Sequence, residues 1–164
     1  MTNQKCAVII SCFPGVGKTA LPGLSHDGSF VNPEGKYAIY DVETMAQDPK
    51  SEEYWQTIET LAQEEDAVVL VAASGDAHRQ LLSRGLRFVC VHPGVDIKDE
   101  YLRRYFDRAG IDRTWISLYR YWQEKIEELQ VRSDGACMYL ELTAGEDLED
   151  MLPYIPAGVE EGAF

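Results

Sequence analysis

The stretch that decides the fold is Cys12-Phe13-Pro14-Gly15-Val16-Gly17-Lys18-Thr19, which follows directly on an apolar run. It matches the pattern Gly-x-x-x-x-Gly-Lys-Ser/Thr at every fixed position except the first, where Cys12 replaces Gly. Gly15 and Gly17 allow backbone conformations in which successive N–H groups turn inward and enclose an anion. A helix that begins at Lys18 would add its positive dipole end. The stretch therefore predicts a phosphate-binding loop between a strand and a helix.

This pattern, the P-loop, gives individual residues a role. We expect Lys18 to reach the β- and γ-phosphates of a nucleotide and the hydroxyl of Thr19 to hold Mg²⁺. The predicted nucleotide-binding residues are Pro14, Gly15, Val16, Gly17, Lys18, Thr19 and Ala20. A dinucleotide-binding fingerprint fits less well, because that kind of loop gains nothing from a lysine at position 18.

The composition indicates one acidic globular domain around this loop. The chain has 164 residues, with 15 Lys and Arg against 28 Asp and Glu, and a formal charge of −13. This length suits a single domain with a core of its own. The negative charge argues against nucleic acid or an anionic membrane as partner, because both are bound mainly by clustered Lys and Arg. Most of the basic residues lie between Arg79 and Arg132, so the acidic chain contains a local cationic region.

Apolar runs and cysteines exclude further classes of protein. The longest apolar stretches, 6–13 and 67–73, are far shorter than the roughly 20 residues of a membrane-spanning helix. The 4 cysteines are widely spaced and form no Cys-x-x-Cys pair. Buried free thiols in a cytoplasmic protein explain them better than a zinc or redox site.

Five short apolar runs predict the strands of a parallel sheet that is covered on both faces. They span residues 6–12, 37–41, 67–73, 86–92 and 137–142. Amphipathic stretches between them predict helices, one capped by Ser51, one over 76–83 that ends at Gly85, and a longer one after Asp112. Residues 25–35 are rich in turn formers and predict a loop. The order predicts an α/β fold, doubly wound and three-layered, with a five-stranded, mainly parallel sheet.

Two absences narrow the nucleotide chemistry. The chain has no Asn-Lys-x-Asp sequence for guanine, which disfavours a GTPase switch. The strand over 67–73 runs into Ser74 and Gly75 rather than ending in Asp-Glu, as in an ATP-driven motor.

The P-loop and the order of elements resemble the small P-loop kinases, which include shikimate kinase, gluconate kinase, the nucleoside monophosphate kinases and phage-type nucleotide kinases. The resemblance spans residues 7–152, and the P-loop is its specific part. It implies the P-loop NTPase fold, ATP as phosphoryl donor and Mg²⁺ as cofactor. It further implies a kinase-like domain over 1–152 with a lid at about 98–114, which leaves 153–164 as a flexible tail.

The resemblance also implies an acceptor site at the ends of two strands. Asp41 and Glu43 stand where the group has an acidic residue that faces substrate and Mg²⁺. Asp41 can orient the acceptor hydroxyl, take its proton or hold the metal together with Thr19. The alternative is that both carboxylates are solvated residues where a strand enters a loop. Ser74 and Arg79 resemble the substrate-binding turn after the third strand, and Arg79 alternatively lies on a plain helix surface.

Arg104 and Arg108, four residues apart, share one helix face in the expected lid region. In the kinases that the chain resembles, such arginines spread the charge of the transferring phosphoryl group. The alternative is pairing with Asp99, Glu100 or Asp107 on a solvated helix. After the last strand, residues 143–145 stand where the group contacts adenine, mostly through backbone.

The function that these features predict is ATP-dependent transfer of the γ-phosphate to a nucleotide, a nucleoside or another small metabolite. Lys18, Asp41, Arg104 and Arg108 are the expected catalytic residues. The alternative is a regulatory or sensing P-loop protein without efficient transfer, which Cys12 and the missing acidic residue after the third strand favour. The expected partners are ATP and a small acceptor, with no nucleic acid and no membrane, for a monomer or homodimer.

Overall fold

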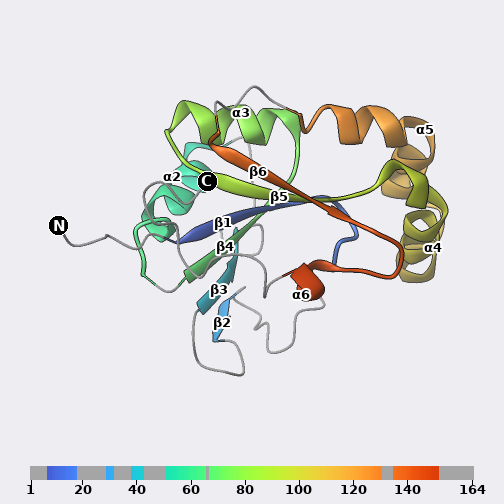
Figure 1. The fold of residues 1–164 in the computed structure, drawn as a ribbon, viewed down its shortest axis with the longest axis horizontal. Coiled ribbons are helices and arrows are strands. Elements are labelled where there is room, and N and C mark those ends of the chain that lie inside the picture. The colour runs from blue at the N-terminus through green and yellow to red at the C-terminus, as the bar shows by residue number, and fades with distance from the viewer. Residues whose placement is uncertain are drawn as a thin grey trace.

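A six-stranded sheet forms the centre of the structure, a computed structural model that describes residues 7–17, 29–31, 38–42, 51–65, 67–130 and 135–151 (Figure 1). Its strands are β1 (Val8–Cys12), β2 (Ser29–Val31), β3 (Ala38–Asp41), β4 (Ala67–Ala72), β5 (Phe88–Pro93) and β6 (Cys137–Leu142). The described strands lie in the order β2-β3-β4-β1-β5-β6, and all but β2 run parallel. The strand that precedes the phosphate loop therefore lies inside the sheet, with its carboxyl end at the same edge as those of its parallel neighbours.

The five predicted strands are confirmed, and the sheet has one strand more than predicted. This strand, β2, pairs antiparallel to β3, with Ser29 opposite Tyr40 and Val31 opposite Ala38. It lies within residues 25–35, where we expected a loop. A strand of three residues is too short for hydrophobic alternation to indicate, and it exists because the edge of β3 offers it hydrogen-bonding partners.

The helices that cover the sheet begin and end close to their sequence signals. They are α2 (Glu52–Leu61), α3 (Gly75–Ser83), α4 (Lys98–Ala109), α5 (Arg113–Glu127) and the short α6 (Leu148–Met151), and a 3₁₀ turn, η2 (Val95–Ile97), precedes α4. Ser51 caps α2 as predicted, because its hydroxyl accepts the amide of Tyr54 at 3.2 Å. Asp112 caps α5 in the same way through the amide of Trp115. The helix predicted from Lys18 and the tail 153–164 lie outside the described residues.

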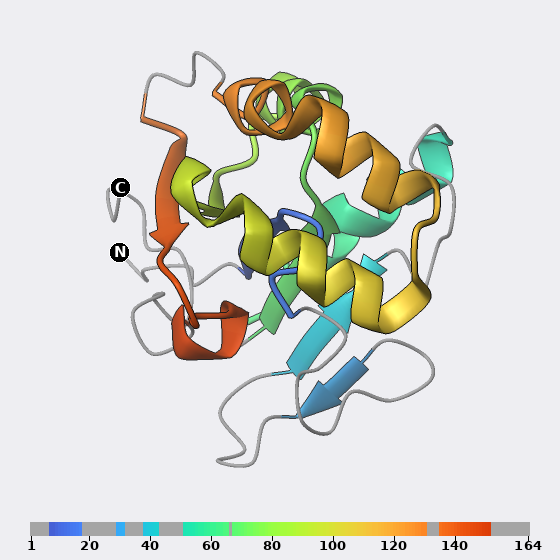
Figure 2. The ribbon, with the colours of Figure 1, turned by 90° about the vertical axis from the view of Figure 1, so that its right-hand side faces the viewer.

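Two apolar cores, one on each face of the sheet, give the predicted three layers. Successive residues of β1 alternate between the faces, so that Ile10 packs with the core that includes α4 and α5, whereas Ile9 packs with the core of α2 and α3. Figure 2 shows α4 crossing in front of the carboxyl end of β1, with α5 beside it. None of the described helices has the length and apolar character to cross a membrane. The sheet edge beneath α4 is thus the place where this fold can build a site.

Candidate functional site

The predicted phosphate loop, residues 12–19, leaves β1 in the middle of the sheet. Its described part, 12–17, is hydrogen-bonded to segments of both neighbouring strands. The amide of Phe13 donates to Val91 O of β5 at 3.0 Å, and the amide of Ala73, after β4, donates to Cys12 O at 2.9 Å. Cys12 is still a strand residue, paired with Ala72 and Val91, and its buried side chain lies in the apolar core. The first position of the motif therefore needs no glycine in this chain.

Gly15 and Gly17 have the backbone conformation that the sequence predicts. Their φ angles are +86° and +98°, in the left-handed region that a residue with a Cβ rarely adopts. An ideal Cβ on Gly15 would lie 2.9 Å from Cε2 of Tyr105 and 3.2 Å from Cδ2 of Tyr101. Glycine is thus required at position 15 both by its φ angle and by the close approach of α4. Lys18, Thr19 and Ala20 lie outside the described residues.

Aromatic side chains anchor the start of the loop in the core. Phe13 is 2% exposed and meets the rings of Tyr101 and Trp122 edge to face, with ring centroids 6.2 Å and 5.6 Å away. Val16 is buried as well. The start of the loop is therefore held in place by packing.

The peptide groups of the loop have partners both inside and outside it. Within the loop, the amide of Val16 donates to Phe13 O at 3.3 Å. From outside, Arg104 Nη1 donates to Gly15 O at 2.8 Å, and the amide of Leu148 donates to Val16 O at 2.6 Å. The carbonyl groups of Gly15 and Val16 are thus satisfied by α4 and by the start of α6.

Tyr101 lies fully buried against Gly15, and burial raises the pKa of its hydroxyl to about 12. The hydroxyl has no hydrogen-bond partner in the part of the chain that the structure describes. An unpartnered buried hydroxyl costs stability, on the order of 1–3 kcal/mol.

Asp41, the predicted acceptor or metal residue, is the last residue of β3 and is 1% exposed. It stands opposite Leu70 of β4, which in turn stands opposite Ile10 of β1, so Asp41 lies two residues before the level at which β1 ends and the phosphate loop begins. The solvated alternative is therefore wrong for Asp41, because the side chain is buried. Glu43 lies outside the described residues.

Ser74 is the N-cap of α3, which follows β4, and Arg79 lies in the middle of that helix. The Ser74 hydroxyl accepts the amide of Ala77 at 3.0 Å and so caps α3. Arg79 forms an ion pair with Asp76 of the same helix, and its side chain is 65% exposed. In the described structure, then, the Ser74 hydroxyl caps the helix, and the Arg79 side chain is largely exposed beside Asp76.

Arg104 and Arg108 take different positions on α4. Arg104 turns toward the phosphate loop, with its guanidinium on Gly15 O and Glu146 O. Arg108 is exposed. Tyr101, on the same helix, lies in the apolar core, so at least the first half of the expected lid region packs onto the sheet in this structure.

Sequence reasoning missed three residues that lie close to this loop and its neighbours. The contacts of Glu100, Tyr101 and Tyr105 with the loop and its neighbours depend on how α4 crosses the sheet, which no local pattern reveals. The hydrophobic spacing of α4 could have marked Tyr101 as buried, but not what it touches.

Comparison with known proteins adds a structural likeness. No protein-family model and no curated protein sequence matches the chain. Among solved structures, a gluconokinase from Sinorhizobium meliloti 1021 is similar with a TM-score of 0.50 and 14% sequence identity, over 92% of this chain and 89% of that chain. At this identity the similarity supports the fold alone. The fold is consistent with the P-loop motif after β1 and with the parallel sheet around it. The chain therefore has the doubly wound α/β fold of the P-loop NTPases.

Proposed function

We propose that this protein is an ATP- and Mg²⁺-dependent phosphotransferase that acts on a small acceptor. The observation that carries the proposal is the conformation of the phosphate loop, with Gly15 at φ +86° and Gly17 at φ +98° at the carboxyl end of β1. Open α/β sheets bind ligands at this edge. Lys18 and Thr19 follow at once in the sequence and supply the cation and the hydroxyl that a nucleotide with its metal requires.

The residues of the chain divide the work of transfer between them. Lys18 and the loop from Pro14 to Ala20 bind the phosphates, and Thr19 with Asp41 offers the oxygen ligands that suit Mg²⁺. Magnesium, when bound, neutralises charge on the phosphate oxygens. Asp41 orients the acceptor hydroxyl and takes its proton. Arg108 stabilises the charge of the transferring group.

The acceptor side of the proposal comprises Glu43, Ser74 and Arg79 together with Asp41. A nucleotide or nucleoside is the first candidate acceptor, because the basic residues of α4 and α5 suit a second phosphate. A sugar acid is the second candidate, and the name of the similar gluconokinase supports its inclusion.

Nucleotide binding tests the first half of the proposal. We expect calorimetry to show that the wild-type chain binds ATP in the presence of Mg²⁺, and that Lys18→Ala weakens binding at least tenfold. Lys125→Ala, in the last turn of α5, removes the same charge away from the loop and should bind ATP like the wild type. Equal affinity of the Lys18→Ala variant and the wild type would show that the P-loop assignment is wrong.

A second candidate function is a nucleotide sensor without efficient transfer. It is favoured by the structural use of Ser74 as a helix cap, because its hydroxyl already accepts the amide of Ala77. ATP binding that no acceptor converts into turnover would support the sensor over the kinase.

A further inference from the structure

We infer that Arg104 is a positioning residue. It fixes the Gly15 carbonyl group of the phosphate loop and joins this loop to the loop between β6 and α6. The sequence suggests that Arg104 is a ligand of the transferring phosphoryl group, and the inference replaces that role. The inference rests on the proposed function, because it takes residues 12–19 to be the phosphate site of a nucleotide.

The guanidinium group of Arg104 bridges two loops that are far apart in the sequence. Nη1 donates to Gly15 O at 2.8 Å, and Nη2 donates to Glu146 O at 3.0 Å. A planar guanidinium can serve two acceptors at once with fixed geometry, whereas the ammonium group of a lysine is a point charge. The bridge is therefore specific to arginine.

Neighbours on α4 fix the orientation of this side chain. The guanidinium carbon lies 4.6 Å from the centroid of the Tyr101 ring, and Nη2 lies 3.6 Å from Oε2 of Glu100. The other carboxylate oxygen of Glu100 accepts the amide of Gly145 at 2.8 Å. Glu100 and Arg104, one helical turn apart, thus grip the segment at residues 145–146 from the same helix face.

The bridge has a direct consequence for anion binding. In a loop whose amides turn inward to an anion, the carbonyl groups must turn outward, and a carbonyl group that is removed from water needs a donor. Arg104 supplies that donor for Gly15, as the amide of Leu148 does for Val16. With the carbonyl groups held from outside, phosphate binding need not order the loop.

The same contacts join the phosphate end of the site to the segment after β6. Glu146 closes that turn, because the hydroxyl and the amide of Thr143 donate to its carboxylate and lower its pKa. Asp147 follows and lies against the phosphate loop, where an ideal Cβ on Gly17 would be 3.3 Å from the Asp147 Cβ. A change in the conformation of one loop should therefore alter the conformation of the other through Arg104.

Hydrogen exchange in the unliganded protein tests the bridge, and Arg103 provides the control. Arg103→Ala removes the same charge from an exposed position of α4. We expect Arg104→Ala to speed amide exchange at least tenfold both in residues 12–17 and in residues 143–148, and Arg103→Ala to change neither segment. Arg104→Lys, which keeps the charge, should loosen both segments to a smaller degree and serves if the alanine variant does not fold.

Binding and turnover separate a positioning role from the other two possibilities. In fully folded Arg104→Ala we expect the Kd for ATP to rise at least tenfold, with a smaller fall in kcat at saturating ATP. An unchanged Kd for ATP would overturn the inference. If kcat then fell more than a hundredfold, Arg104 would be a transition-state ligand. If kcat were unchanged as well, Arg104 would have a role in stability alone. If the wild type binds no ATP, the proposed function fails, whereas the exchange experiment still decides whether the bridge exists.

Discussion

The hydroxyl of Ser11 and Nε2 of His78 lie 2.6 Å apart in the buried layer between β1 and α3. On the other side of the ring, Nδ1 lies 2.9 Å from Leu129 O, which can only accept, so we assign the ring proton to Nδ1. Nε2 then accepts the hydroxyl proton of Ser11. Both residues have no exposed surface, so this pair of a serine and a histidine is closed to substrates and ties the strand before the phosphate loop to α3.

This pair predicts a dependence of stability on pH. Burial is the largest cause that lowers the pKa of His78 below its usual value of 6.5. Well above pH 6.5 the ring is neutral in both states, whereas at lower pH the unfolded chain takes up a proton more readily than the folded chain does. The free energy of unfolding should therefore fall as the pH drops below 6.5, by at most about 1.4 kcal/mol per pH unit. Urea unfolding between pH 5.5 and pH 8 measures this slope.

The control for that slope is His78→Gln, which removes the titrating ring and leaves the other two histidines in place. We expect its stability to change less between pH 6.5 and pH 5.5 than that of the wild type. Equal slopes for the two proteins would show that another group is responsible.

The unpartnered hydroxyl of Tyr101 predicts an unusual response to its removal. Because this buried hydroxyl has no partner among the described residues, Tyr101→Phe should leave the free energy of unfolding unchanged or raise it by about 1 kcal/mol. Tyr139→Phe is the matched variant, since the Tyr139 hydroxyl donates to Leu129 O at 2.9 Å and its removal should cost about 1 kcal/mol. Chemical denaturation of both variants decides the point, and a larger loss for Tyr101→Phe than for Tyr139→Phe would contradict the structure.

Two glycines with positive φ separate backbone strain from close contact. Gly85 has φ +70° and open space where a Cβ would be, so Gly85→Ala should cost about 1–2 kcal/mol of stability from strain alone. Gly15→Ala adds overlap with Tyr105 to the same strain and should cost more, besides weakening ATP binding. Melting temperatures and ATP titrations of the two variants test this, and equal losses would mean that α4 does not press on the loop.

The proposed role of Asp41 as a base predicts that its replacement lowers turnover without preventing ATP binding. Asp41→Asn keeps the size of the side chain and removes the base, so we expect acceptor turnover to fall at least a hundredfold while ATP is still bound. Asp99→Asn, on the exposed face of α4, makes the same chemical change away from the site. Turnover of Asp41→Asn within a few fold of that of Asp99→Asn would remove Asp41 from the reaction.

Local patterns in the sequence are sufficient for much of the fold. The apolar runs mark the five parallel strands because a sheet that is covered on both faces buries nearly every residue of a strand. Spacing of three and four residues predicts one buried face for the helix after Asp112, made of Trp115, Leu118, Trp122, Ile126 and Leu129. All of these are buried except Trp115, which is half-buried. Ser51 and Asp112 mark helix starts through hydrogen bonds to amides three residues further on, a distance that sequence reasoning can see.

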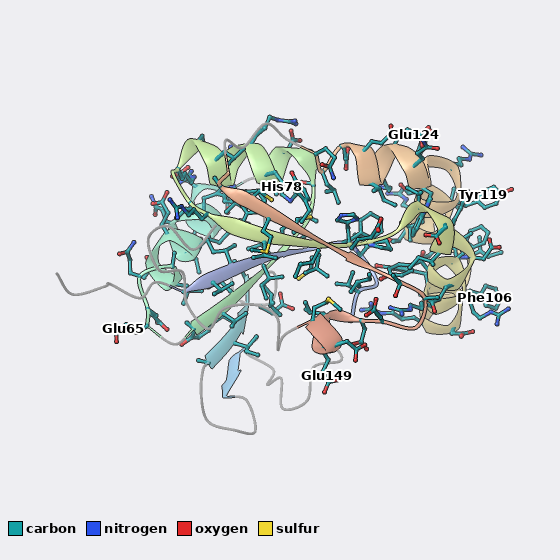
Figure 3. The ribbon with its side chains drawn as sticks, in the orientation of Figure 1. Glu65, His78, Phe106, Tyr119, Glu124 and Glu149 are labelled. Carbon is teal, nitrogen blue, oxygen red and sulfur yellow. The ribbon has the colours of Figure 1, made fainter. Side chains whose placement is uncertain are left out.

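The rest depends on contacts over long separations in the chain. Arg104 and Gly15 are 89 residues apart, and Ser11 and His78 are 67 residues apart. Neither pair leaves a local trace, so Arg104 could be recognised as a basic helix residue but not as a partner of the phosphate loop. Phe106 and Tyr119 show the opposite case: they project outward from α4 and α5 and are 54% and 55% exposed, although their residue types suggest burial (Figure 3).

Acceptor-dependent release of ADP tests the central claim most directly. The purified protein is incubated with ATP, Mg²⁺ and each member of a panel of nucleoside monophosphates, nucleosides and sugar acids including gluconate, and ADP is measured with and without the acceptor. The account predicts that one class of acceptor raises ADP release far above the rate with ATP alone and that Lys18→Ala abolishes this increase. ATP binding without any acceptor-dependent turnover across the panel would contradict the kinase and favour a nucleotide sensor.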